Sequence, residues 1–297
     1  MSTREQVRPV VRGFYDIQKL RMQIGLRLVA SFKAKLGAVP QQEDEESLGE
    51  DARQLLADIR RDYDRVADAI AQHPARRREF VAQGLIGTVE EYALVQMYVN
   101  LDVAEEAAYG QVRRVVETHP LWAVFLKGVK GVGPAMAGVI LSEIDIHKAR
   151  YRSSLYCYAG LDCVGGPTDG VGRSRRKEHL VERAYVDKRG QEQTRMAITF
   201  NPFLKTKLVG VLAGSFLRAG RGNKYAEVYR NYKHRLECHP RHVEKTKGHR
   251  DAMAKRYMIK VFLGDLYEAW RTLEGLPVHV PYAEAKLGAE PHGGVAL

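Results

Sequence analysis

The 297-residue sequence predicts a mainly α-helical fold, with an N-terminal helical bundle or coiled coil and a helical C-terminal domain that contains a helix-hairpin-helix and a small β-hairpin. Apolar residues recur at helical spacing through most of the first 118 residues. Two short helical segments, at residues 119–129 and 134–144, flank a glycine-containing turn, whereas convincing strand alternation occurs only within residues 179–200. We therefore expect domains at 1–118 and 119–275, followed by an extended or disordered tail at 276–297.

The first two predicted helices each carry an apolar stripe between charged positions. The stripe of the first consists of Phe14, Ile17, Ile24 and Leu28, and that of the second of Leu55, Ile59, Val66 and Ile70. Residues 38–51 between the two helices are polar and acidic, so we expect a loop or a mobile linker there.

The third predicted helix begins after a capping box, with Thr88 as the N-cap and Glu91 three residues later. Pro120 ends it, because the residue before a proline disfavours helix. Between these ends runs a near-heptad apolar stripe made of Leu94, Met97, Leu101, Ala104, Ala108, Val112 and Val115. Such a stripe forms either the seam of a bundle or that of a dimerising coiled coil, and the sequence leaves both open.

The C-terminal half begins with the two strands, which the sequence places around a turn at residues 187–190. After them, Asn201 supplies an N-cap and Pro202 the first position of an apolar helix. This helix is expected to run to Gly220. Two more helices follow at residues 225–236 and 249–275, the last closed by its terminal glycine.

Charge is unevenly distributed along the chain, whose formal net charge is +11. Residues 147–260 hold 26 Lys or Arg against 10 Asp or Glu, whereas the rest of the chain is net acidic. A basic region of this size predicts a polyanionic partner, because each neutralised phosphate releases counterions. The alternative is a well-solvated basic surface without such a partner.

The sequence contains no long uncharged apolar run, and its N-terminus is charged where a signal peptide needs apolar residues. We therefore expect a cytoplasmic protein with no membrane partner. The cysteines, Cys157, Cys163 and Cys238, are odd in number and too few for a disulfide framework, which agrees with a reducing compartment.

The stretch LKGVKGVGPAMAGVILSEID predicts two helices joined by a turn at Gly131 and Gly133, with Pro134 at the start of the second helix. Glycines permit positive φ and let the backbone approach a phosphate closely, while amides at a helix N-terminus favour an anion. Lys127 and Lys130 add positive charge. The alternative is a helical corner that needs glycines for packing alone. A hairpin of this kind binds phosphates and therefore supplies affinity with little sequence specificity.

This hairpin, the segment SSLYCYAGLD, a glycine- and arginine-rich stretch, a KRG turn and a helix follow one another in an order that resembles the C-terminal domain of insertion-sequence-110-type transposases. The resemblance covers about residues 120–272. It implies recombination of DNA segments, with a serine nucleophile in this domain and acidic metal ligands in a RuvC-like N-terminal domain. In some members a structured RNA helps to choose the target. No RuvC-like domain is recognisable in residues 1–118.

The resemblance places the nucleophile in a Ser-Gly pair shortly after AGL, where this chain has DCVGGPTDGVGRSRR. Thr168 lies nearest to that pair, and Ser174 lies further on, in a basic cluster. Arg173, Arg175 and Arg176 would favour the alkoxide of Ser174 and hold a phosphate. Alternatively, Ser174 is a phosphate-contacting residue without a catalytic role. Magnesium is the one cofactor expected, and only if the chain is catalytic.

Three other groups of residues have two interpretations each. A zinc site or a basic phosphate-contacting loop is predicted at His234, Cys238, His239 and His242. Base stacking or core packing is predicted for Tyr225, Tyr229, Tyr232 and Tyr257, which lie among basic residues. Glu143 and Asp145 end the second hairpin helix and are expected to be surface charges rather than metal ligands.

Together these features predict a DNA-binding protein of transposition or site-specific recombination. The alternatives are a catalytically inactive accessory factor and an RNA-binding structural protein. Duplex DNA is the expected partner, and a structured RNA and a second copy of the chain are further candidates. The candidate DNA contacts are Lys127, Lys130, Gly131, Gly133, Arg173, Arg175, Arg176, Lys188 and Arg189.

Overall fold

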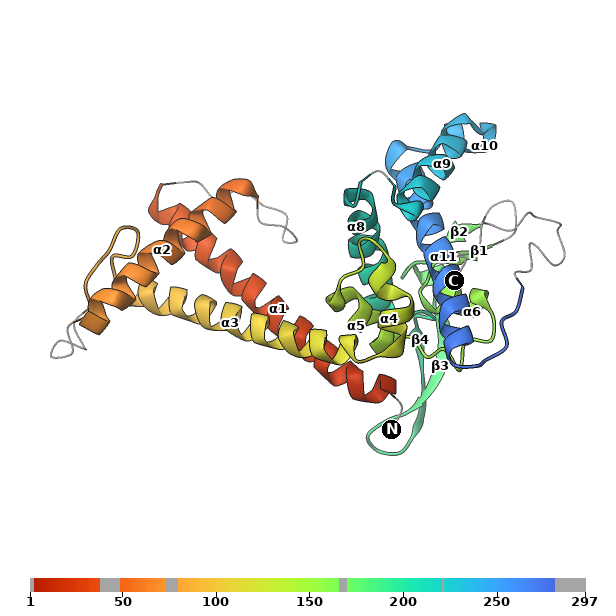
Figure 1. The fold of residues 1–297 in the computed structure, drawn as a ribbon, viewed down its shortest axis with the longest axis horizontal. Helices are drawn as coiled ribbons and strands as arrows, with labels where there is room; N and C mark the ends of the chain where they lie inside the picture. Colours follow the sequence, from red (N-terminus) through yellow and green to blue (C-terminus); the bar gives the residue numbers. More distant parts are fainter. Residues whose placement is uncertain (1–2, 38–48, 73–79, 166–169, 221, 281–297) are drawn as a thin grey trace. The chain divides into compact units, whose positions relative to one another are not determined.

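The computed structural model is mainly helical, as the sequence predicts (Figure 1). It describes residues 3–37, 49–72, 80–165, 170–220 and 222–280. The chain forms two compact units, one of residues 9–112 and one of residues 1–8 with 113–297. The expected domain boundary after residue 118 lies close to the second of these junctions.

The unit of residues 9–112 is built from helix α1 (Thr3–Lys35), helix α2 (Glu50–Gln72) and helix α3 (Val89–Glu117). Both predicted stripes lie on buried or half-buried faces of α1 and α2. The shared core consists of Leu28, Val29, Phe32, Ala52, Leu56, Ile59, Val66, Ile86 and Val95. Residues 38–48 of the predicted linker lie outside the described residues, while its last two residues already belong to α2.

The predicted capping box of α3 is confirmed. The Thr88 hydroxyl accepts a hydrogen bond from the Glu91 amide, and the Glu91 carboxylate accepts one from the Thr88 amide, both at 3.2 Å. Burial acts to raise the pKa of Glu91, but hydrogen bonds from Lys35 and from the Gly87 amide outweigh it and hold that pKa below its ordinary value of 4.5. The carboxylate therefore stays charged and joins the ends of two helices.

The apolar stripe of α3 lies largely where predicted, with Val112 buried. Its other members are half-buried except Met97, whose exposure of 54% shows that its assignment to the seam was wrong. The buried contact of that turn is made by Val95 instead. Leu94 of the stripe packs against the core that the three helices share.

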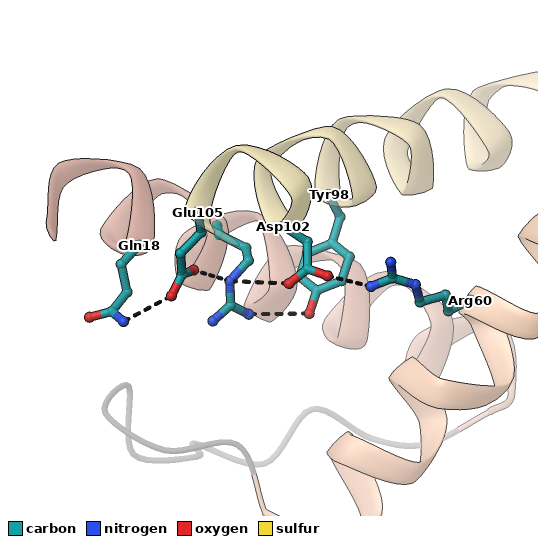
Figure 2. Close-up of polar contacts among 6 residues, drawn as sticks. Gln18, Arg60, Tyr98, Asp102 and Glu105 are labelled. Atoms are coloured by element: carbon teal, nitrogen blue, oxygen red, sulfur yellow. Dashed lines mark hydrogen bonds and ion pairs between the residues drawn. The ribbon is translucent and has the colours of Figure 1, made fainter. Parts of the chain in front are cut away.

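A polar network also joins the three helices (Figure 2). The Arg21 guanidinium on α1 donates to Glu105 on α3 and, at 3.3 Å, to the Tyr98 hydroxyl. Arg60 on α2 donates to Asp102, which also lies 3.6 Å from Arg21. Because several charges of both signs share partners, the network contributes more to the stability of the fold than isolated surface ion pairs do.

The second unit consists of short helices around helix α11 (Lys247–Leu273), which is buried along most of its C-terminal half. The others are α4 (Pro120–Val124), α5 (Pro134–Glu143), α6 (Arg152–Tyr158), α7 (Pro202–Lys205), α8 (Ala213–Arg218), α9 (Lys224–Cys238) and α10 (Pro240–Val243). Phe216 and Tyr225 stack with ring centroids 4.7 Å apart, and Phe262 lies edge-on to both at 5.4 Å. These rings place α8, α9 and α11 around one core.

The predicted ends of several helices are confirmed. The Asn201 side chain caps α7 by accepting from the Leu204 amide, and Gly275 ends α11 with a φ of +64°. The predicted single helix from Pro202 is instead interrupted by a π-helical segment, Thr206–Leu212, before α8. Residues 276–280 form neither helix nor strand, and residues 281–297 lie outside the described residues.

The predicted β-hairpin is confirmed as strands β3 (Val181–Val186) and β4 (Glu192–Ala197), which pair antiparallel. A second pair, β1 (Cys163–Val164) and β2 (Val171–Gly172), was not predicted, because strands of two residues show no periodicity. No helix in the described part of the chain is long and apolar enough to cross a membrane.

Candidate nucleic-acid interface

The predicted helix-hairpin-helix is formed by α4, a 3-10 turn at Leu126–Gly128 and α5. Gly131 has a φ of +99°, which side-chain-bearing residues rarely adopt. A Cβ there would lie 3.0 Å from the Phe216 ring and 3.2 Å from the backbone of Ser215. This glycine is therefore required by the turn and by its packing against α8.

Gly133 does not have a positive φ, so the expectation of positive φ at both glycines was wrong for it. Its φ is −97° and its ψ is 173°, an extended conformation that any residue adopts. A Cβ built there meets nothing within 4 Å. Gly133 is exposed and is the N-cap of α5, and no side chain of a described residue makes a capping hydrogen bond there. The first-turn amides of α5 thus have no side-chain cap, and the open approach to them is over a glycine.

The hairpin is held in place by its neighbours. Lys127 and Lys130 are both exposed at the turn. The Lys130 carbonyl accepts a hydrogen bond at 2.8 Å from the side chain of Asn223, which is buried and also caps α9. The buried residues inside the hairpin are Val132, Ala137, Gly138, Val139, Ile140 and Ile144. The lysine side chains therefore project from a fixed backbone.

Glu143, at the end of α5, is fully buried, so the expectation of a surface charge was wrong for it. Its carboxylate accepts a hydrogen bond from the Asn201 side chain at 2.6 Å and lies 3.5 Å from the Arg8 guanidinium. Asp145 is partly exposed, between Arg4 and Lys148. Glu143 thus fixes the C-terminal end of the hairpin against α1 and the start of α7.

Ser174 lies in the loop after β2 and contacts a histidine that the sequence analysis did not single out. Its hydroxyl lies 3.0 Å from Nδ1 of His179, and that nitrogen also accepts from the Ser174 amide at 3.0 Å. The Arg176 amide donates to the hydroxyl at 3.3 Å. Because Nδ1 accepts a hydrogen bond from the amide, it carries no proton of its own. The Ser174 hydroxyl therefore donates its hydrogen bond to Nδ1. Ser174 and His179 form either a nucleophile and its base or a turn held together by local hydrogen bonds.

The three arginines around Ser174 have different roles. Arg173 makes hydrogen bonds of 2.8 and 2.9 Å to the Asp162 carboxylate and one of 2.8 Å to Thr199. The hydrogen bond to Asp162 raises the pKa of Arg173. Because its guanidinium is bound within the fold, Arg173 is better explained as a structural residue than as a phosphate clamp. Arg175 and Arg176 are exposed, and Thr168 lies outside the described residues.

Lys188 and Arg189 occupy the tip of the β3–β4 hairpin, and both are exposed. The Asp187 carboxylate holds the turn by accepting from the Arg189 amide at 2.7 Å and from the Gln191 amide at 3.0 Å. The backbone of the tip is therefore ordered while the two basic side chains extend into solvent.

The four tyrosines divide into two pairs. Tyr225 and Tyr229 are buried, and their hydroxyls donate to Asp265 and Asp251. Burial raises the pKa of both, with the neighbouring carboxylates adding to it. Their role is packing. Tyr232 and Tyr257 stack on each other with ring centroids 4.1 Å apart. They line a pocket of about 400 Å³ together with Lys224, Val228, Asn231, Arg235 and Val261.

The histidines expected in a basic loop instead lie on α9 and α10 or between them, and they do not gather around one point. Cys238 lies 3.8 Å from a ring nitrogen of His234, one turn away on α9. His239 caps α10, and its Nδ1 accepts from the Arg241 amide. Burial and the nearby cations lower the pKa of His242. No three His, Cys, Asp or Glu side chains of the described residues are grouped as a metal site would require.

No protein-family model matches the chain, and a search of curated proteins found no match. We therefore infer the function from the geometry of these residues. Sequence reasoning missed His179, because a serine and a histidine five residues apart follow no periodic pattern.

Proposed function

We propose that this chain is a DNA-binding protein of transposition or site-specific recombination. It binds duplex DNA through the phosphate backbone of the DNA. One observation carries the proposal: the α4–α5 hairpin presents an N-cap glycine, Gly133, at an exposed turn flanked by the exposed Lys127 and Lys130. Backbone amides at a helix N-terminus favour a phosphate, and the lysines add attraction that does not depend on base sequence.

The distribution of charge supports the same partner. The surplus of Lys and Arg lies in residues 147–260, which follow the hairpin directly and belong to the same compact unit. Arg175, Arg176, Lys188 and Arg189 are exposed in two separate loops of that unit. Several cations presented to solvent in this way would neutralise several phosphates at once.

The two hairpin glycines provide the test, because their roles differ. Gly133→Ala should weaken duplex binding about tenfold while leaving thermal unfolding unchanged, since a Cβ fits the backbone but obstructs approach to the amides. Gly131→Ala should instead lower the free energy of unfolding by about 1–3 kcal/mol. Gel shifts and thermal melts of both variants measure this, and a Gly133→Ala protein that binds like the wild type would remove the hairpin from the interface.

Catalysis is a second candidate function, favoured by the 3.0 Å approach of Ser174 to His179. In such a step the serine oxygen bonds to the phosphorus, its proton passes to Nδ1, and the bond from phosphorus to a deoxyribose oxygen breaks. The leaving oxygen then takes up a proton. The arrangement supplies a nucleophile and a base, but of the three adjacent arginines only Arg175 and Arg176 are exposed for a phosphate.

We expect the purified chain alone to bind duplex DNA without forming a covalent adduct, which fits an accessory or regulatory factor. A nicked suicide duplex, incubated with and without Mg²⁺ and analysed by denaturing electrophoresis, tests this. An adduct that disappears in both Ser174→Ala and His179→Ala would establish the catalytic function instead. Cleavage that persists in Ser174→Ala and Thr168→Ala would contradict the serine assignment.

A further inference from the structure

The β3–β4 hairpin is an exposed two-stranded ribbon (Figure 1). Every residue of β3 is exposed, as is every residue of β4 except Ala197. An isolated two-stranded ribbon is marginally stable in water, and both of its edges have unpaired backbone groups. The ribbon adds little to the stability of the fold, so we expect it to have a role in binding.

The two faces of the ribbon carry opposite charge. Side chains alternate between faces along each strand, so the register Arg183 to Arg195 and Tyr185 to Gln193 places these four residues on one face. The Arg195 guanidinium lies 5.0 Å from the centroid of the Tyr185 ring, which confirms that they share it. The opposite face carries Glu182, Ala184, Val186, Glu192, Thr194 and Met196.

The basic face pairs two arginines across the strands. Arg183 and Arg195 lie directly opposite each other, and like charges in such a cross-strand pair destabilise a sheet. Neither strand places an acidic residue on that face, and the carboxylate of Asp187 in the turn is bound by the Arg189 and Gln191 amides. A phosphate or the acceptor atoms of a base edge would remove the repulsion, whereas the acidic and apolar face would repel a nucleic acid.

The dimensions of the ribbon fit a duplex groove. Six residues per strand span about 20 Å, and a two-stranded ribbon enters the major groove of B-DNA, which is about 12 Å wide. Lys188 and Arg189 at the tip extend the positive charge beyond the strands. We propose that the β3–β4 ribbon is a DNA arm that lies in the major groove with its Arg183, Tyr185, Gln193 and Arg195 face toward the bases and phosphates.

This inference rests on the proposed function, and its test separates the two. Fluorescence anisotropy with a random-sequence duplex is measured for the wild type, for Arg183→Gln/Arg195→Gln and for Glu182→Gln/Glu192→Gln, which changes two charges on the opposite face. The arginine variant should bind at least about tenfold more weakly, and its plot of log affinity against log salt should be shallower by about 1.8. The glutamate variant should bind as tightly as the wild type or slightly more tightly.

A second duplex tests the groove. Glucosylated hydroxymethylcytosine fills the major groove, so it should weaken binding by the wild type but hardly affect the arginine variant. If the arginine variant and the wild type bind the unmodified duplex equally, the inference is overturned and the proposed function still stands. A ribbon variant that loses self-association but no DNA binding would also overturn it, in favour of a contact between copies. No duplex binding by the wild type would overturn both.

Discussion

The affinity of this chain for duplex DNA should fall about a thousandfold or more between about 50 and 200 mM salt. The exposed lysines and arginines of the C-terminal unit would displace counterions from six to ten phosphates at a rough estimate, and each displacement adds about 0.9 to the slope of log affinity against log salt. The α4–α5 hairpin contributes phosphate contacts without base contacts. The salt dependence of the affinity should therefore be the same for unrelated duplex sequences. A titration in four salt concentrations measures the slope.

The loop after β2 provides a matched variant for this measurement. Arg175→Gln/Arg176→Gln removes two exposed charges beside Ser174 and should reduce the slope by about 1.8, with little effect on folding. A response to salt that is flat in the wild type would show that the basic region is a solvated surface. A slope that is steep but unchanged in the variant would assign the phosphate contacts to other residues.

Replacing Glu143 with alanine should lower the free energy of unfolding by about 2–4 kcal/mol. The carboxylate is fully buried, and its loss would deprive the Asn201 side chain and the Arg8 guanidinium of an acceptor. Because Glu143 ends α5, the hairpin should also lose its rigid anchor and bind DNA less tightly. Urea denaturation followed by circular dichroism measures the first effect.

Two controls distinguish the roles of charge and burial at this position. Glu143→Gln keeps an oxygen that accepts from Asn201 and should cost clearly less than the alanine variant. Asp145→Asn changes a partly exposed acid two residues away, where surface pairs contribute at most about 1 kcal/mol. Equal stability of Glu143→Ala and the wild type would contradict a stabilising role for the buried carboxylate.

Local signals in the sequence predicted the secondary structure well. Thr88 and Glu91 cap α3, Asn201 caps α7, and the turn of the β3–β4 hairpin falls where the glycine-containing segment predicted it. Each of these depends on residues within about four positions of one another, so a linear pattern contains the whole interaction. The general position of the glycine hairpin follows from the same kind of signal.

The details of the candidate site depend on contacts that are distant in sequence. The buried Glu143 carboxylate is bound by Asn201, 58 positions later in the chain, and Arg173 is bound by Asp162 and Thr199. The separate roles of the two hairpin glycines depend on the ring of Phe216, which no local pattern could place. Such pairings require the tertiary fold, and the sequence analysis could therefore name the charged residues without assigning their partners.

The most direct test of the account compares two pairs of lysine and arginine substitutions by fluorescence anisotropy on the same duplex. Lys127→Gln/Lys130→Gln removes the charges beside the α5 N-terminus, and Lys19→Gln/Arg53→Gln removes the same number of exposed charges from the unit of residues 9–112. We expect the hairpin variant to bind about tenfold more weakly with a shallower salt dependence, and the control variant to bind like the wild type. Equal affinity of the two variants would contradict the assignment of the α4–α5 hairpin as a DNA-binding element.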